Sequence, residues 1–163
     1  MEFADVVRRR RMIRRYAPER AVSRAAVTRF LELASRAPSA GFSQGWDFLV
    51  LTATGDRERF WRLTTDPAAP ADSWLEGMRT APVLVVCLSD PERYLDRYAE
   101  PDKGWTDRDP SRWPVPYWDV DTGMAALILQ LAAVDDGLAA CFFGIPSDRI
   151  PVLRQGFSIP DDR

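Results

Sequence analysis

The chain has 163 residues, of which 46% are hydrophobic and 28% are charged, and its formal net charge is -2. This length and composition predict a single compact domain over residues 1–163 with a hydrophobic core. Nucleic-acid-binding domains are usually basic overall, and no stretch is long and apolar enough to predict a membrane-spanning helix. We therefore expect a cytoplasmic protein that binds neither nucleic acid nor a membrane.

The chain contains no histidine, which excludes histidine-based catalytic triads and histidine metal ligands. Cys87 and Cys141 lie far apart in apolar surroundings and match no zinc-binding spacing. We therefore expect two buried thiols and no metal site. If the protein is an enzyme, a bound cofactor is expected to carry the chemistry.

The first elements are predicted to be helical. A short helical face over residues 3–7 precedes an arginine-rich segment, and Pro18 and Pro38 bracket a second helix. Ser23 is its predicted N-cap, and its end is expected near Arg36. Its apolar positions recur with helical spacing and are Val27, Phe30, Leu31 and Ala34.

The middle of the chain alternates between strands and helices. Residues 47–52 predict a strand, residues 56–63 a helix, and residues 81–89 a second, buried strand. Pro91 then suits the first position of another helix. Residues 100–118, with four prolines and four aromatic rings, predict a long loop of the kind that often binds ligands.

The last third predicts the longest helix. It covers residues 120–133 and is ended by Gly137. Residues 139–143 predict a third strand, closed by Gly144, and Ser147 is the predicted cap of a final helix. Alternating strands and helices indicate an α/β or α+β domain.

Positive charge is concentrated near the N-terminus. Residues 1–20 contain seven arginines and three acidic residues, which makes this segment +4 and the remainder -6. Arg10, Arg11 and Arg14 could converge on one anion, because guanidinium groups offer planar, paired donors that suit phosphate. A solvated basic helix face explains the same composition, and both interpretations stay open at this point.

Two further segments are notable. Residues 38–46, PSAGFSQGW, connect a predicted helix to a predicted strand, where ligand loops are common, and their small residues allow close approach of a ligand to the backbone. A plain connection with a packed Trp46 is an equal alternative. Residues 137–144, GLAACFFG, by themselves indicate a helix stop and a buried strand.

Together, and in this order, the three segments resemble those of the nitroreductase superfamily of FMN-dependent oxidoreductases. The family pattern Arg-Arg-Ser-x-Arg-x-aromatic corresponds to residues 10–16, RRMIRRY, and the pattern Ala-Pro-Ser-x-x-Asn-x-Gln-Pro-Trp corresponds to residues 37–46, APSAGFSQGW. A long apolar helix, Gly-Leu and a short strand ending in Gly correspond to residues 124–144. The resemblance covers nearly the whole chain and implies an α+β fold, a three-layer α-β-α sandwich with a central, mainly antiparallel sheet flanked by helices.

The resemblance implies an FMN site built partly from the early arginines. Arg10 and Arg11 correspond to positions near the phosphate and ribityl chain. Arg14 corresponds to a cation near the pyrimidine edge of the flavin, where positive charge favours the anionic reduced form. The backbone around Phe143 and Gly144 corresponds to the segment near flavin N5.

A loop that usually comes from the partner subunit completes the implied site. Pro38, Ser39 and Ala40 correspond to this loop, and Gln44 corresponds to a position close to the same site. Phe42, Trp105 and Trp113 are expected in the substrate pocket. The implied cofactor-binding residues are therefore Arg10, Arg11, Met12, Arg14, Pro38, Ser39, Ala40, Gln44, Phe143 and Gly144.

The family resemblance also implies a homodimer with FMN at the interface and a ping-pong reaction. NADH or NADPH reduces the flavin, and a small flat acceptor such as a nitroaromatic or a quinone then takes the electrons. No side chain is implied as catalytic, because flavin N5 carries the hydride.

The chain departs from the family pattern at four places. Met12 replaces the usual Ser, Phe42 the usual Asn, and Gly45 the usual Pro, and the C-terminal strand and tail of the family are absent from the sequence. Other functions therefore stay open. The protein could be a family offshoot acting as a dehydrogenase, dehalogenase or flavin-degrading enzyme, or a flavin-binding sensor or storage protein without turnover. A nucleic-acid-binding domain that uses the arginines is the remaining alternative, and the acidic remainder argues against it.

Overall fold

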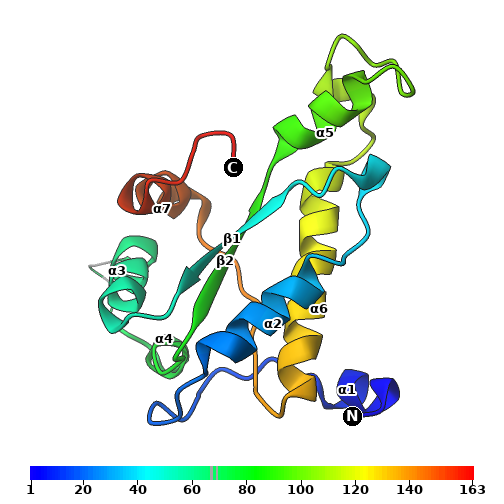
Figure 1. The fold of residues 1–163 in the computed structure, drawn as a ribbon. Coiled ribbons are helices and arrows are strands. Elements are labelled where there is room, and N and C mark those ends of the chain that lie inside the picture. The colour runs from blue at the N-terminus through cyan, green and yellow to red at the C-terminus, as the bar shows by residue number, and fades with distance from the viewer. Residues whose placement is uncertain (67, 69) are drawn as a thin grey trace.

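The computed structural model describes residues 1–66, 68 and 70–163 and shows a two-stranded sheet with helices on both faces (Figure 1). The strands β1 (Trp46–Leu51) and β2 (Leu84–Ser89) pair antiparallel, with Trp46 opposite Ser89 and Leu51 opposite Leu84. One face packs against α2 (Arg24–Ala34) and α6 (Tyr117–Asp135). The other packs against α3 (Thr54–Thr64), α4 (Ser73–Met78) and α7 (Ile150–Phe157). The remaining elements are α1 (Phe3–Arg9), α5 (Pro91–Ala99) and the short 3-10 turns η1 (Ala40–Phe42), η2 (Pro110–Arg112) and η3 (Ser147–Arg149).

The alternation of side chains along β1 creates two cores. Trp46 and Phe48 point to one face and pack with Ala34 of α2 and Ala125 of α6. Leu51 points to the other face, into the cluster that contains Phe60 and Trp61 of α3, Met78 of α4 and Leu153 of α7. Because successive strand residues face opposite sides, one six-residue strand supplies both cores.

The helix α6 extends across most of the domain. At its N-terminal end it lies beside η1, and at its C-terminal end it lies beside α1 (Figure 1). With 19 residues it is about 28 Å long. Its apolar residues are spread round the helix, so Val120 and Leu127 remain 45% and 46% exposed even though Ala125 and Ala133 are buried.

The α+β class and several local signals were predicted correctly. Ser23 caps α2, and its Oγ accepts a 3.1 Å hydrogen bond from the N–H of Ala26. Pro91 begins α5, and Gly137 follows α6 with a φ of 76°. Both strands of the sheet and the helix α3 lie within a few residues of their predicted bounds.

Two predictions about elements were wrong, one helix boundary was shifted and one helix was missed. Residues 139–143 form no regular strand, and only Ala140 makes a single parallel bridge, to Met12, because residues 10–13 offer too short a partner to extend a ladder. The long helix begins at Tyr117 rather than at residue 120, which shortens the predicted loop. The side chain of Ser147 does not cap α7, and α4 was not predicted at all.

The two cysteines are also less buried than predicted. Cys87 and Cys141 are both free and half-buried, and both face a cavity between the sheet and α6. Among the described residues, no helix combines the length and apolar character that crossing a bilayer requires.

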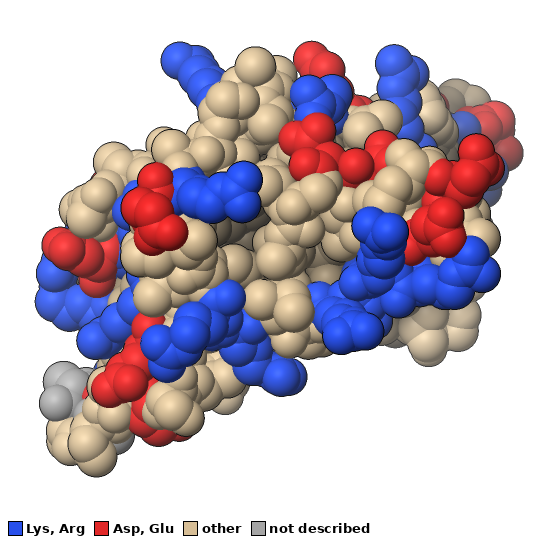
Figure 2. Space-filling view, turned by 90° about the horizontal axis from the view of Figure 1, so that it is seen from below, with Lys and Arg blue, Asp and Glu red and all other residues tan. Residues whose placement is uncertain are grey.

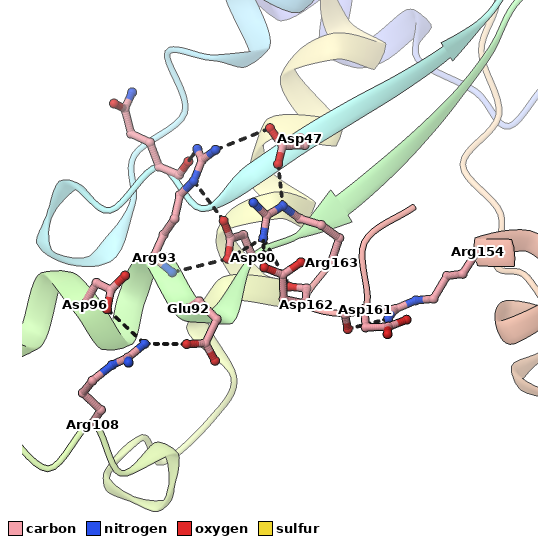
Figure 3. Close-up of polar contacts among 11 residues, drawn as sticks. Asp47, Asp90, Glu92, Arg93, Asp96, Arg108, Arg154, Asp161, Asp162 and Arg163 are labelled. Atoms are coloured by element: carbon pink, nitrogen blue, oxygen red, sulfur yellow. Dashed lines mark hydrogen bonds and ion pairs between the residues drawn. The ribbon is translucent and has the colours of Figure 1, made fainter. Parts of the chain in front are cut away.

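An ion-pair network joins the two strand ends to α5 and to the last residue of the chain (Figure 3). Asp90 is 1% exposed and is paired with Nε of Arg93 at 2.9 Å and with Nη1 of Arg163 at 3.0 Å. Nε of Arg163 also donates to Asp47 at 2.8 Å. A buried carboxylate requires such partners, because an unpaired charge in the interior is strongly destabilising. Arg163 therefore ties the C-terminus to the start of β1 and the end of β2.

Replacing Arg163 by alanine should lower the free energy of unfolding by about 2 kcal/mol, because Asp90 and Asp47 each lose a charged donor while Arg93 still pairs with Asp90. Urea denaturation of the Arg163→Ala variant measures the change. Arg36→Ala, at an exposed position beyond the end of α2, is the matched control and should leave the midpoint unchanged. Equal midpoints for all three proteins would show that the network contributes nothing to stability.

Candidate functional site

The arginine-rich segment and the GLAACFFG segment lie side by side. After α1 the chain becomes extended, and Met12 forms a parallel bridge with Ala140. The N–H of Ile13 donates a 3.1 Å hydrogen bond to the carbonyl of Ala140. These backbone contacts connect segments separated by more than 120 residues and bring two of the three predicted site segments together.

The arginines of this segment differ in their partners. Arg8 pairs with Asp5 on the same helix, as expected for a surface residue. Among the described residues, no acidic side chain pairs with Arg10, Arg11 or Arg14, although Arg10 is half-buried. On the face viewed in Figure 2, basic side chains flank an uncharged hollow. Unpaired guanidinium groups are available to bind an anion.

The backbone of residues 14–16 is held tightly against α4. A Cβ on Gly77 would lie 2.2 Å from the carbonyl oxygen of Arg14, so this approach requires glycine. The N–H of Tyr16 donates to Oγ1 of Thr80 at 2.8 Å, and its hydroxyl donates to the carbonyl of Ile13 at 2.6 Å. Arg14 is thus attached to a fixed stretch of backbone.

Arg14 lies near Cys141. Burial raises the pKa of the Cys141 thiol above its ordinary value, and the positive charge of Arg14 lowers it in part. Burial also raises the pKa of Tyr16 to about 12, with Cys141 adding to the increase and Arg14 opposing it. The charge of Arg14 therefore acts on the segment that leads to Phe143 and Gly144.

The segment after Cys141 alternates between core and surface. Phe143 stacks on Trp61, with ring centroids 5.5 Å apart, and meets Phe60 and Trp74 edge-on. Within the described part of the chain, nothing lies within 4 Å of the position that a Cβ on Gly144 would occupy. The ring of Phe143 thus fixes the segment in the core, and the backbone at Gly144 faces open space.

The third predicted segment, residues 38–44, lies at the opposite end of α6. The N–H of Ala40 donates to Asp121, in the second turn of that helix, whereas the N-terminus of the chain pairs with Asp135 in its last turn. Fourteen residues of helix separate these two contacts, a distance of about 20 Å. One copy of the chain does not bring Pro38, Ser39, Ala40 and Gln44 next to the arginines (Figure 1).

The structure explains one departure from the family pattern. Gly45 lies so close to Tyr94 that a Cβ would be 2.4 Å from its ring and 2.7 Å from the carbonyl oxygen of Asp90. The proline that the family has at this position would not fit. Met12 is half-buried and contributes its backbone to the bridge with Ala140, and Phe42 is 75% exposed.

Trp105 and Trp113 belong to an aromatic cluster beside α5. Their ring centroids are 5.4 Å apart, and Tyr98 contacts both, at 4.9 and 4.5 Å. Arg112 lies over Trp105, and both tryptophans are half-buried. Their place in a substrate pocket stays a prediction, because the rings mainly contact one another.

Sequence analysis did not identify Asp121, Tyr94 or Arg97, which hold the residue 38–44 loop. Asp121 accepts the hydroxyl of Tyr94 at 2.8 Å, and Nε of Arg97 donates to the carbonyl of Gly41 at 2.9 Å. Burial and the bond to Asp121 raise the pKa of Tyr94 well above its usual range, so the hydroxyl stays a donor. The sequence shows only an aspartate near the start of a helix. Nothing in it indicates that this side chain contacts a loop about 80 residues earlier.

A cavity of about 370 Å³ lies between β2, α2, α6 and residues 137–143. Its wall is mainly apolar, with Arg15, Arg20, Tyr16, Gln130 and the two cysteines as the exceptions. Phe143 is on its wall, whereas Arg10, Arg11 and Arg14 are not among the residues that form it.

A model of the nitroreductase family matches residues 7–163. The chain belongs to the nitroreductase family. A relative from Archaeoglobus fulgidus, provisionally named NADH dehydrogenase/NAD(P)H nitroreductase, is 26% identical over 163 residues, which are 99% of this chain and 79% of that protein.

Solved structures of nitroreductase-like proteins share the fold. A provisionally named NADH oxidase from Clostridium acetobutylicum superimposes with a TM-score of 0.71 at 24% identity, over 97% of this chain and 80% of its own. A provisionally named nitroreductase from Exiguobacterium sibiricum, solved in complex with FMN, gives 0.72 at 22% identity, over 100% of this chain and 83% of its own. At these identities the likeness establishes the fold.

Replacing Arg14 by alanine should slow alkylation of Cys141 by iodoacetamide at pH 8. Removing the positive charge raises the thiol pKa further, and only the thiolate reacts. Peptide mass spectrometry after timed quenching measures the rate at each cysteine.

Cys87 is the internal control, because burial alone raises its pKa to about 11. It should react very slowly in both proteins. An Arg14→Ala variant in which Cys141 reacts at the original rate would show that Arg14 does not act on this segment.

Proposed function

We propose that the protein is an FMN-dependent oxidoreductase that takes electrons from NADH or NADPH and reduces a small flat acceptor, such as a nitroaromatic or a quinone. The observation that carries the proposal is the Met12–Ala140 bridge, which joins the arginine segment to the chain four residues before Gly144, where the backbone is open. Membership of the nitroreductase family and the FMN-bound relative support the choice of cofactor.

The residues present fit FMN in charge and in space. The 5′-phosphate needs cationic donors, and Arg10 and Arg11 have no competing acidic partner among the described residues. A flat ring needs unobstructed space at the backbone, and no described atom lies within 4 Å of the position that a Cβ on Gly144 would occupy. Arg14, on backbone fixed by Gly77, would place positive charge beside the ring.

When bound, FMN supplies hydride transfer through its N5 atom. The role of this chain is therefore to bind FMN and to orient it. Arg10 and Arg11 would hold the phosphate, Arg14 would stabilise negative charge on the reduced flavin, and residues 142–144 would contribute backbone to the cofactor site. This division of work fits a chain without histidine.

We also propose that the protein acts as a homodimer with FMN at the interface. The residue 38–44 loop lies about 20 Å along α6 from the arginine end of the helix, so a second copy is the source from which it can reach the same cofactor. Exposed apolar side chains on α1 and α6 are consistent with such contact; they are Phe3 and Val7 on α1 and Val120 and Leu127 on α6.

The purified protein should be yellow, with flavin absorbance that bleaches on addition of NADH or NADPH. Arg10→Ala and Arg14→Ala should each weaken FMN binding by about 1.5–3 kcal/mol, the scale of a lost hydrogen bond to a charged group. Fluorescence titration with FMN measures the affinity.

Arg8→Ala is the matched control, because Arg8 pairs with Asp5 on its own helix, and it should bind FMN as the unmodified protein does. A colourless protein that also fails to take up added FMN would contradict the proposed function. Unchanged affinity in both test variants would remove the two arginines from the site.

Mixed dimers test the second copy. Arg14→Glu should disable the arginine end of each site and Ser39→Trp the loop end, so each variant alone should be inactive. In a mixed dimer both defects fall in one site, and the other site is intact, so about half of the activity should return.

Two differently tagged copies, expressed together and purified by both tags, provide the mixed dimer. NADH oxidation with a quinone acceptor measures the recovery. If the doubly tagged protein is a dimer and is still inactive, each complete site lies within one copy, and the proposal of a shared site is wrong.

A further inference from the structure

The loop between α2 and β1 has a backbone that its own residues do not favour. Gly41, Phe42 and Gln44 all have positive φ angles, of 61°, 58° and 50°. Glycine adopts this left-handed region freely, whereas phenylalanine and glutamine do so at a cost in free energy. Such a conformation persists only where surrounding groups hold it, so contacts to the loop must offset the cost.

A buried aspartate holds the first part of this loop. Asp121 is 2% exposed, and its Oδ2 accepts the backbone N–H of Ala40 at 2.8 Å and the hydroxyl of Tyr94 at 2.8 Å. Both donors are uncharged groups. Burying a carboxylate costs free energy that hydrogen bonds must offset, so the two bonds are strongly favoured and fix Ala40 to α6 and α5 together.

Side chains of α5 hold the rest of the loop. The ring of Tyr94 leaves no room for a side chain at Gly45, and Nε of Arg97 donates to the carbonyl of Gly41 at 2.9 Å. Arg97 is itself fixed by Asp102, whose two oxygens accept from Nη1 and Nη2 at 2.8 Å each. The loop therefore has anchors on both sides of Phe42.

The residue between these anchors faces solvent. Phe42 is 75% exposed, and its ring is in none of the aromatic pairs found among the described residues. An exposed phenylalanine forgoes the gain from burying its ring, and here its backbone also has an unfavourable conformation. Both costs fall on one position, which indicates that the ring is held ready for a contact outside this chain.

We propose that Asp121 is the positioning residue of the loop and that Phe42 is the side chain it presents, as a fixed aromatic surface against which a flat acceptor stacks. The assignment rests on the proposed function, in which this loop reaches the FMN site of a second copy. Tyr94 and Arg97 act with Asp121 by holding the loop, and neither contacts the acceptor. Fixing the ring in advance lowers the entropy lost when an acceptor binds.

The positioning role can be measured without a cofactor, by limited proteolysis. Chymotrypsin cleaves after exposed aromatic residues in mobile segments. Phe42 should resist cleavage in the unmodified protein despite its exposure, and Asp121→Asn should speed cleavage after Phe42 at least tenfold. Phe142, which is 54% exposed and far along the chain, is the internal control and should be cleaved at an unchanged rate.

Tyr94→Phe removes only the hydroxyl that Asp121 accepts and serves as a second, milder variant. It should also speed cleavage after Phe42 selectively. Rapid cleavage after Phe42 in the unmodified protein, or equal acceleration at Phe42 and Phe142 in both variants, would overturn the positioning role.

The stacking role is tested by steady-state kinetics with two acceptors. Phe42→Ala should raise KM for menadione, a flat naphthoquinone, about tenfold, and should raise KM for ferricyanide, which is not flat, less than twofold. Phe42→Tyr should restore the KM for menadione. Asp121→Asn should also raise the KM for menadione, although Phe42 is present. The KM for menadione of the double variant should be no higher than that of Phe42→Ala alone.

The outcomes separate this inference from the proposed function. A protein that binds FMN and is bleached by NADH, but whose KM for menadione is unchanged in Phe42→Ala, overturns the stacking role and leaves the proposed function intact. A protein that binds no FMN overturns the proposed function together with the stacking role, while proteolysis still decides whether Asp121 positions the loop. Additive effects of Asp121→Asn and Phe42→Ala would show that the two residues act separately.

Discussion

α6 is a straight stretch of 19 residues, and each of its ends is attached to a different part of the candidate site. Asp121 near one end holds the residue 38–44 loop, and the chain leaving the other end pairs with the arginine segment through Ala140. A helix of this length does not fold back on itself, so the two parts stay about 20 Å apart within one copy. The proposed division of the site between two copies rests on this spacing.

Two buried aspartates stabilise the structure in different ways. Asp90 is neutralised by two arginines and joins the strand ends to the C-terminus. Asp121 has an amide and a hydroxyl as partners and joins a loop to two helices. The first arrangement contributes mainly to stability, because opposite charges offset the cost of burial. The second contributes mainly to geometry, because hydrogen bonds from uncharged donors are directional and hold the loop in one conformation.

Elements with strong local signals were predictable from the sequence. The N-cap Ser23, the helix start at Pro91 and the stop at Gly137 depend on interactions within a few residues, and each is present in the structure. Predictions that depended on distant partners were less successful. Residues 139–143 have a strand-like composition, but a strand forms only where a neighbour continues the ladder, and here the bridge at Ala140 is isolated.

For the candidate site, the sequence by itself determined the kinds of residues available: clustered arginines, a loop rich in small residues and no histidine. This set of residues already favoured a cofactor-based chemistry. Only the tertiary structure decided which segments meet. It joins Met12 to Ala140, separates both from the residue 38–44 loop, and recruits Asp121, Tyr94 and Arg97 to hold that loop. The physical reason is that residue type is a local property, whereas a buried hydrogen bond such as that from Ala40 to Asp121 exists only once packing has brought two distant segments together.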